Sequence, residues 1–286
     1  MIQSMTGFGK ASLQLPTKKI TVEIKSLNSK GLDLNTRMPS VFREMELGLR
    51  NQISQRLERG KVDFSLYVEV TGEETSSKIN VPIVKGYINQ MKAVIPNADE
   101  TELMKMAVRM PDALKTERDE IDENEWKQIQ TVINEALENI ANFRKDEGAS
   151  LEKEFQLRIT NINSLMNEAV SYDAERVETV KTRLRTALDE LKVNVDENRF
   201  EQELIFYLEK YDITEEKVRL GNHLNYFLET LNGTEANGRK LGFITQEMGR
   251  EINTMGSKSN HTEMQKLVVM MKDELEKIKE QVLNVL

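Results

Sequence analysis

Two sets of charged side chains in the last third of the chain have the types and spacing that metal and phosphate chemistry needs. In the first set, Glu247 and Glu251 lie four residues apart within the polar segment 238–260. Carboxylates at positions i and i+4 of a helix repel each other unless a cation or an arginine lies between them. Hard divalent cations prefer such oxygen ligands. The pair therefore predicts a place for Mg²⁺ or Mn²⁺.

The second set is a row of polar side chains before and within a predicted helix. Asp212, Glu216, Arg219 and His223 are separated by four, three and four residues. On a helix this spacing places all four within about 60° of one another. Such a row can bind a metal, hold phosphate or move protons. The alternative is a structural ladder, in which Asp212 or Glu216 pairs with Arg219 and the histidine is incidental.

Basic side chains accompany both sets. Gly256 fits the end of one helix, and Asn260 with Glu263 fits the start of the next. The connecting residues 257–259 offer hydroxyl groups and a cation near a helix N-terminus, a place suited to phosphate. The alternative is a solvated helix followed by a plain turn. The candidates for phosphate binding in this region are Arg219, Arg239, Lys240, Arg250 and Lys258.

The elements that must position these side chains are amphipathic helices. Between residues 238 and 256, Arg239, Gln246 and Arg250 fall on the side opposite an apolar stripe. Residues 199–231 predict one or two more helices with a bend near Tyr211 and Asp212. The apolar stripe of the first helix is formed by Leu241, Ile244, Met248, Ile252 and Met255.

The first part of the chain predicts a small sheet with one packed helix. Ile20, Val22 and Ile24 alternate with polar residues, as in a half-buried strand, and Gly7 and Gly9 indicate either a close approach of the backbone or a bulge. We expect an α+β fold with an N-terminal domain at 1–115 and a helical domain at 116–286. Its expected elements are strands at 1–15, 19–29, 32–38 and 62–70, helices at 40–57, 80–95 and 100–110, a long helical hairpin at 123–191 interrupted near 146–148, and helices at 199–286 that return toward the sheet.

The composition excludes several classes of protein. The chain has 286 residues, no cysteine and a formal net charge of −8. Disulfides, thiolate catalysis and cysteine-bound zinc are therefore excluded, and general nucleic-acid binding is disfavoured. Residues 1–80 are nevertheless basic, with 12 Lys and Arg against nine Asp and Glu. No segment reaches the ~20 apolar residues of a membrane span or has the pattern of a signal peptide. We expect a soluble, cytoplasmic protein.

Several motifs resemble one family. The segment GRKLGFITQEMGREINTMGSKSN resembles the C-terminal signature of the YicC/YloC family of bacterial endoribonucleases. The segments MIQSMTGFGKA, VEIKSLNSKGLD and ERGKVDF resemble its N-terminal signature, and DITEEKVRLGNHL resembles a family motif with acidic residues, an arginine and a histidine. The likeness runs from Met1 to the C-terminus, with a weakly matching middle.

The resemblance implies a hexameric, divalent-metal-assisted endoribonuclease that cleaves single-stranded RNA, with a possible part in small-RNA or mRNA turnover. On this basis Arg59 and Lys61 join the RNA-binding candidates and grip the strand farther from the cut. Glu203 joins the metal-ligand candidates. The expected metal ligands are then Glu247 and Glu251 with one or more of Asp212, Glu216 and Glu203, and the expected catalytic residues are Glu247, Glu251, His223, Glu216 and Asp212.

RNA can be cut by two routes. In one, a base activates the 2′-OH, and in the other a metal activates water. The chain lacks two acid–base histidines with a clear role, so the acidic residues favour the metal route. His223 could protonate the leaving oxygen or orient a carboxylate. Two other classes remain: a non-catalytic RNA-binding or adaptor protein, and an oligomeric scaffold in which the charged signature is a structural network.

Overall fold

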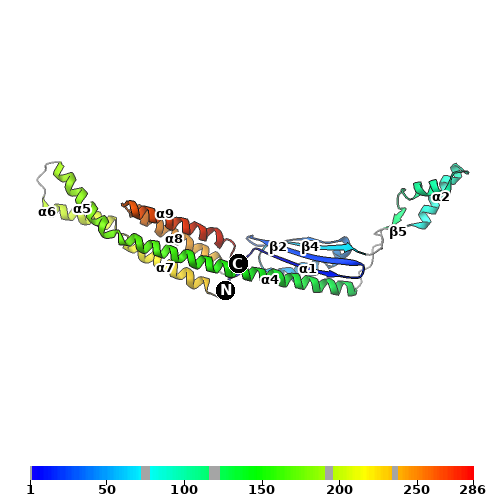
Figure 1. Ribbon diagram of the computed structural model, residues 1–286, viewed down its shortest axis with the longest axis horizontal. Helices are drawn as coiled ribbons and strands as arrows, with labels where there is room; N and C mark the ends of the chain where they lie inside the picture. The colour runs from blue at the N-terminus through cyan, green and yellow to red at the C-terminus, as the bar shows by residue number, and fades with distance from the viewer. Residues whose placement is uncertain (1, 72–77, 116–122, 191–195, 234–237) are drawn as a thin grey trace.

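The computed structural model describes residues 2–71, 78–115, 123–190, 196–233 and 238–286. Figure 1 shows an elongated arrangement: a four-stranded sheet in the middle, a helical bundle on one side of it, and a small helical unit on the other. The expected α+β class is confirmed. None of the helices in the described ranges is long and apolar enough to cross a membrane.

The sheet has the strand order β1-β2-β4-β3, and only the β3–β4 pair is parallel. The predicted alternation of β2 is confirmed, because Ile20, Val22 and Ile24 are all fully buried. These side chains pack with α1 and with the first half of α4. The elements of this unit are β1 (Gly7–Gln14), β2 (Lys18–Leu27), β3 (Leu32–Arg37), the 3₁₀ helix η1 (Ser40–Met45), α1 (Glu46–Leu57) and β4 (Gly60–Val70).

One continuous helix, α4 (Glu123–Ser171), joins the sheet to the bundle. Its 49 residues span about 73 Å. The predicted interruption near residues 146–148 is wrong, and so is the hairpin over 123–191. Gly148 stays helical because the backbone of Ile2 packs against it where a side chain would stand. The two cores therefore divide within α4: Ile129 to Ile140 pack under the sheet, and Phe155 to Met166 enter the bundle.

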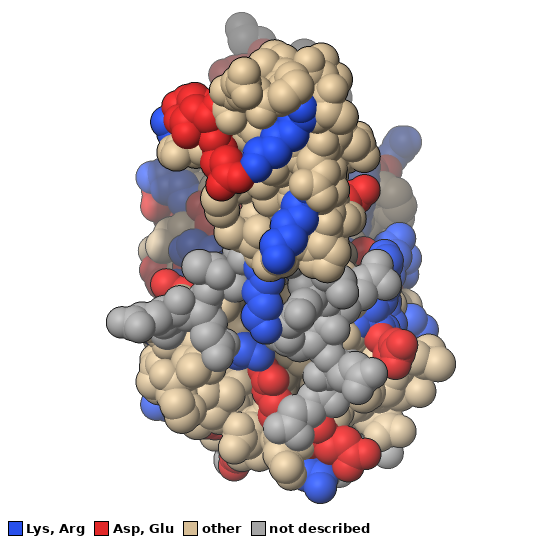
Figure 2. All heavy atoms as spheres, turned by 90° about the vertical axis from the view of Figure 1, so that its right-hand side faces the viewer, with Lys and Arg blue, Asp and Glu red and all other residues tan. Residues whose placement is uncertain are grey.

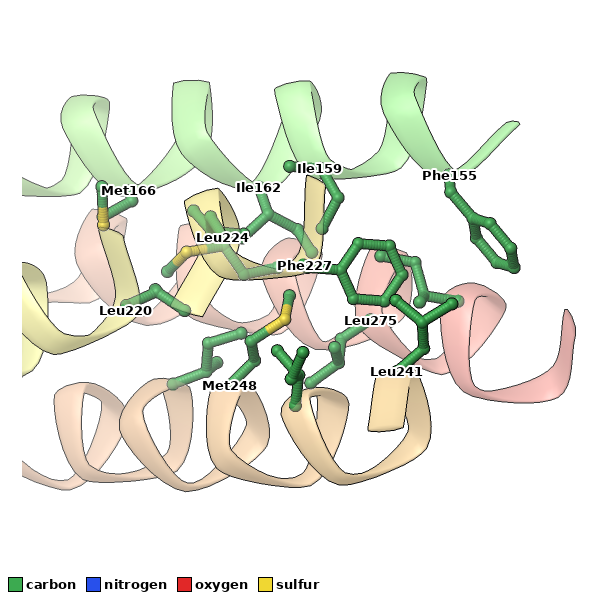
Figure 3. Packing of buried hydrophobic residues seen from close by; sticks show 14 of the residues in the cluster. Phe155, Ile159, Ile162, Met166, Leu220, Leu224, Phe227, Leu241, Met248 and Leu275 are labelled. Atoms are coloured by element: carbon green, nitrogen blue, oxygen red, sulfur yellow. The ribbon is translucent and has the colours of Figure 1, made fainter. Parts of the chain in front are cut away.

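The bundle consists of the second half of α4 with three helices from the last third of the chain. Figure 3 shows Leu220, Leu224 and Phe227 of α7 directed into the space shared with α4 and α8. Phe155 and Phe227 meet edge to face, with ring centroids 5.7 Å apart. This apolar interior holds the helices in place by burial. The three added helices are α7 (Thr214–Leu231), α8 (Gly238–Lys258) and α9 (Thr262–Val282).

The last residues of the chain return to the N-terminus. The backbone N–H of Leu286 donates to the carbonyl of Gln3 at 3.0 Å, and Ser4 forms an isolated antiparallel bridge with Val285. The helical hairpin α5 (Asp173–Glu190) and α6 (Glu197–Lys210) extends from the opposite end of the bundle (Figure 1). On α6, Ile205 and Phe206 are 57% and 61% exposed.

A small unit lies beyond the sheet, at the end of the molecule away from α5 and α6 (Figure 1). It has its own core, built from Val84, Ala107 and Ala113. Two short strands bring the start and end of the unit together. Its elements are β5 (Lys78–Ile79), α2 (Val81–Val94), α3 (Glu100–Ala107) and β6 (Leu114–Lys115).

The connection between α8 and α9 differs from the prediction. Gly256 does not end the helix, because α8 continues to Lys258 and the glycine faces Val268 of α9. The residue that caps α9 is His261 rather than Asn260, since Nδ1 of His261 accepts a hydrogen bond from the backbone N–H of Met264 at 3.4 Å. The expected phosphate loop at 257–259 is thus largely helix.

Candidate active site between α7 and α8

Helices α7 and α8 lie antiparallel, and two contacts between them fix their register. Near the start of α7, Glu216 accepts a hydrogen bond from Lys258 at the end of α8, with 2.7 Å between Oε1 and Nζ. Farther along α7, the ring of Tyr226 lies under Lys240 from the start of α8, with Nζ 4.7 Å from the ring centroid. We call the strip between these two contacts the α7–α8 seam.

The spacing of the polar residues places them along this seam. On α7, His223 follows Glu216 by seven residues, or close to two turns, so both face the same way. On α8, Glu247 and Glu251 lie between Lys240 and Lys258 with separations of seven, four and seven. The seam therefore carries a lysine at each end, two glutamates between them on α8, and the imidazole on α7.

The carboxylates of the seam are more buried than charged groups usually are. Glu216 is 4% exposed and Glu251 is 9% exposed. One carboxylate oxygen of Glu216 is buried and accepts no hydrogen bond, whereas the buried Oε1 of Glu247 lies against the guanidinium of Arg250. Burying negative charge without a partner is costly unless a cation compensates it. The seam thus holds negative charge whose compensation within one chain is incomplete.

The guanidinium of Arg250 partly offsets the repulsion between the carboxylates of Glu247 and Glu251 on α8. It lies 2.9 Å from a carboxylate oxygen of Glu247, at a spacing of i, i+3. The arginine is 73% exposed, so this surface pair contributes little stability. No hydrogen bond to the carboxylate of Glu251 is found in the described part of the chain. Of the two, Glu251 has the less compensated charge.

The seam offers two carboxylates rather than a complete metal cage. Within the described ranges, no three Asp, Glu or His side chains come together closely enough to hold one ion. Glu203 lies exposed on α6, and Asp212 precedes α7. Glu247 and Glu251 still fit Mg²⁺ or Mn²⁺, because Mg²⁺ commonly takes one or two carboxylates and fills its other positions with water. The buried Glu251, whose carboxylate receives no hydrogen bond from the described residues, agrees with such a ligand.

Asp212 has a local structural role that the predicted row does not include. Its Oδ1 accepts hydrogen bonds from the backbone N–H of Thr214 at 2.9 Å and from the hydroxyl of Thr214 at 2.7 Å. These hydrogen bonds, with the charges of Lys258 and Arg176, lower the pKa of Asp212. Asp212 stands outside α7, so the helical spacing does not extend to it.

The arginine of the predicted row also turns away from the seam carboxylates. Arg219 forms its ion pair with Glu215 rather than with Asp212 or Glu216, and its side chain is 55% exposed. The row of four is therefore reduced to Glu216 and His223. The structural ladder predicted an ion pair between Arg219 and Asp212 or Glu216. Arg219 does form an i, i+4 ion pair, but its partner is Glu215.

The predicted RNA-binding cations fall into two regions. Arg239, Lys240, Arg250 and Lys258 all belong to α8, and the first three are exposed. The other two lie at the sheet: Nε of Arg59 donates to the carbonyl of Ser29 at 2.8 Å, and Lys61 is exposed on β4. The structure brings Lys240 and Lys258 to the seam, places Arg239 and Arg250 on the exposed side of α8, and leaves Arg59 and Lys61 with the N-terminal core.

Sequence reasoning missed Arg176, which holds the end of the seam together. Its side chain is 4% exposed and reaches 2.6 Å from Asp173. It also donates to the carbonyl of Tyr211 and, at 3.4 Å, to that of Lys258. The arginine thus ties together the segment before α7 and the end of α8. The charged run around it in the sequence gives no sign of burial, because its partners are backbone atoms from distant segments.

The chain also matches known proteins over its full length. Residues 2–153 match the model of the N-terminal region of YicC-like endoribonucleases, and residues 169–286 match that of the C-terminal region. The chain is 33% identical over 293 residues to a probable endoribonuclease YicC of Clostridioides difficile, with all of both chains covered. It belongs to the YicC-like endoribonuclease family. The resemblance found in the motifs is thereby confirmed.

A second YicC relative supports the same membership. The chain is 29% identical over 287 residues to a probable endoribonuclease YicC of Haemophilus influenzae, with 99% of each chain covered. The two YicC-like regions are separated by residues 154–168, which lie inside α4. The family regions therefore divide near the place where α4 passes from the sheet core to the bundle core.

Proposed function

We propose that this protein is an endoribonuclease that cleaves single-stranded RNA, and that the α7–α8 seam carries the reaction. The observation that carries this proposal is the poorly compensated negative charge of Glu216, which has one buried oxygen without a hydrogen bond, and of the buried Glu251, in a strip with a lysine at each end. Uncompensated carboxylates suit a cation, and flanking lysines suit phosphates. Family membership supplies the reaction class.

In this proposal Glu247 and Glu251 would hold Mg²⁺ or Mn²⁺. A bound divalent cation would supply an activated water and neutralise charge on the phosphate that is cut. A further ligand from Glu203 or Asp212 would have to come from another subunit, because the described residues of one chain bring no third group to the pair. The carboxylate of Glu216 accepts a hydrogen bond from Lys258 and would therefore orient the ammonium group of that lysine.

The other side chains of the seam would bind and orient the RNA. Lys240 and Lys258 would contact phosphates on either side of the cut, with Arg239 and Arg250 on the exposed side of α8. His223, half-buried on α7, would either protonate the leaving oxygen or orient a carboxylate. Arg59 and Lys61, at the sheet, would hold the strand farther away.

The assembly and the setting are further parts of the proposal. The family resemblance implies a hexamer, and the exposed apolar residues Ile205 and Phe206 of α6 support contact between subunits. We propose a cytoplasmic enzyme of small-RNA or mRNA turnover, and the absence of cysteine agrees with a reducing compartment.

A non-catalytic RNA-binding or scaffold protein is the competing proposal. The observation that favours it is that three signature cations, Arg219, Arg250 and Lys258, are paired with carboxylates of the same chain. A salt network of this kind can be purely structural. It leaves the buried oxygen of Glu216 that accepts no hydrogen bond unexplained.

One experiment separates these proposals. The purified protein is incubated with end-labelled single-stranded RNA and Mn²⁺, with and without a chelator, and both cut products and bound RNA are measured. The nuclease predicts products that disappear with the chelator. An RNA-binding protein would give a complex without products, insensitive to chelation. A scaffold would give neither.

A further inference from the structure

The small unit formed by α2 and α3 contains a basic groove that the seam does not explain. The groove has a volume of about 930 Å³ and lies between the two helices. Lys85 and Lys92 come from α2, Lys105 comes from α3, and Arg109 follows the end of α3. Among the described residues that line it, Glu100 is the one that is acidic. The groove is thus strongly cationic in a chain that is acidic as a whole.

Two of the four cations have no acidic partner in the described part of the chain. Lys92 pairs with Glu100, and Lys105 lies 2.8 Å from Glu102. Lys85 and Arg109 are exposed and form no ion pair with any described residue. Figure 2 looks onto this end of the molecule, where Lys and Arg side chains descend in a column with acidic side chains to one side. This surface attracts an anionic ligand.

The walls of the groove are apolar between the cations. Ile88 is half-buried against the small core of the unit, and Met104 is 48% exposed on α3. Val108 completes this lining. A ligand that fits must therefore present negative charges at intervals and flat or apolar groups between them. Single-stranded RNA has this chemistry, with phosphates for the cations and unstacked bases for the apolar walls.

The position of the unit indicates that the groove is distant from the seam. In Figure 1 the unit lies beyond the sheet, at the opposite end of the molecule from α5 and α6, while the seam lies in the bundle. Its core is separate from both main cores. We propose that the α2–α3 groove is an accessory binding site for single-stranded RNA, which holds a part of the substrate distant from the cut. The inference rests on the proposed nuclease function only for the identity of that substrate.

The test removes the two unpaired cations. The Lys85→Gln/Arg109→Gln variant is compared with Lys153→Gln/Lys272→Gln, which removes two exposed lysines of the bundle helices α4 and α9. RNA binding is measured over a range of salt concentrations, apart from cleavage. The groove variant should lower the slope of log affinity against log salt by about 1.4, since each lost phosphate contact on a single strand contributes about 0.7. The control variant should leave the slope unchanged.

Cleavage of RNAs of increasing length then shows where the groove acts. The groove variant should raise KM for long RNAs several-fold and leave kcat, and the cleavage of the shortest substrates, unchanged. Salt slopes equal to those of the control variant would overturn the inference, as would an equal loss of activity on short and long RNAs. If the wild-type protein binds RNA without cutting it, the nuclease proposal fails while the salt slopes still decide the groove.

Discussion

At the residue scale, the chemistry of the seam depends on how each carboxylate is compensated. Glu216 has a lysine on one oxygen and nothing on the other, whereas Glu251 is buried without a hydrogen bond in the described part of the chain. Elsewhere in the bundle, the half-buried carboxylate of Glu274 is well satisfied. Glu274 of α9 receives hydrogen bonds from Arg158 at 3.2 Å, Asn161 at 2.9 Å and Lys277 at 2.6 Å. The contrast separates a structural carboxylate from the candidate ligands.

Glu274 therefore gives a pH-dependent prediction for stability. Burial raises the pKa of Glu274, but the hydrogen bonds from Lys277, Asn161 and Arg158 outweigh it and hold the pKa at about 2. The folded state thus gains stability above the unfolded pKa of 4.5, and that gain is lost as the pH falls toward 2. Glu274→Gln should lower the free energy of unfolding by on the order of 1–2 kcal/mol at pH 7.

Urea denaturation at a series of pH values measures this effect. The difference between Glu274→Gln and wild type should shrink steadily between pH 4.5 and 2. The matched control is Glu276→Gln, whose carboxylate is 64% exposed and pairs with Lys279 only; it should change stability little at any pH. If the free energies of unfolding of Glu274→Gln and wild type differed by the same amount at pH 7 and near pH 2, the lowered pKa assigned to Glu274 would be contradicted.

At the scale of elements, α4 contributes buried side chains to both the sheet core and the bundle core. At one end, β1 crosses α4 so closely that a Cβ on Gly9 would lie 2.8 Å from the backbone nitrogen of Ile140, and still nearer the carbonyl of Ala136. The close approach predicted for the glycines of β1 is confirmed here. Backbone atoms cannot move aside cheaply, so the glycine is required by packing.

Gly9→Ala should consequently destabilise the protein by more than about 2 kcal/mol, because the strand must lift away from α4. The control is Gly48→Ala on α1, where a Cβ meets nothing within 4 Å. That change should raise stability by about 0.5–1 kcal/mol, since alanine favours a helix. Thermal and urea denaturation measure both. An equal effect of the two substitutions would show that β1 does not pack on α4 in this way.

The elements themselves could be predicted from the sequence wherever one periodicity dominates. The alternation in β2 and the apolar stripe of α8 gave the correct element and the correct buried face. The places where helices end or are interrupted were predicted less well. Glycine usually weakens a helix, but Gly148 and Gly256 stay helical because Ile2 and Val268 pack against them. Those partners are distant in the sequence, so no local pattern reveals them.

Only part of the candidate site could be predicted from the sequence, because helical spacing describes one helix at a time. Helical spacing correctly placed Glu216 and His223 on one face, and Glu247 with Glu251 on another. It cannot show that the two faces meet, because that follows from the antiparallel packing of α7 on α8. It also assumed that the helix reaches Asp212, which instead precedes it and accepts a hydrogen bond from the backbone N–H of Thr214. The metal assignment itself stays a prediction.

At the scale of the whole molecule, exposed apolar surface predicts an assembly. Ile205 and Phe206 are adjacent on α6, and the α5–α6 hairpin extends away from the bundle (Figure 1). Ile205→Asp/Phe206→Asp should therefore lower the molar mass found by sedimentation velocity from that of the proposed hexamer to that of a smaller species. The control is Leu47→Asp, a single leucine 73% exposed on α1. An unchanged mass for the α6 variant would place the subunit contacts elsewhere.

The central claim is that Glu251 acts in RNA cleavage as a metal ligand of the seam, and single-turnover cleavage tests it most directly. Glu251→Ala and the isosteric Glu251→Gln are compared with wild type at saturating Mn²⁺, with bound RNA measured in parallel. We expect both variants to lose cleavage by at least about 100-fold and to retain RNA binding. Full cleavage by Glu251→Ala at saturating Mn²⁺ would contradict the central claim.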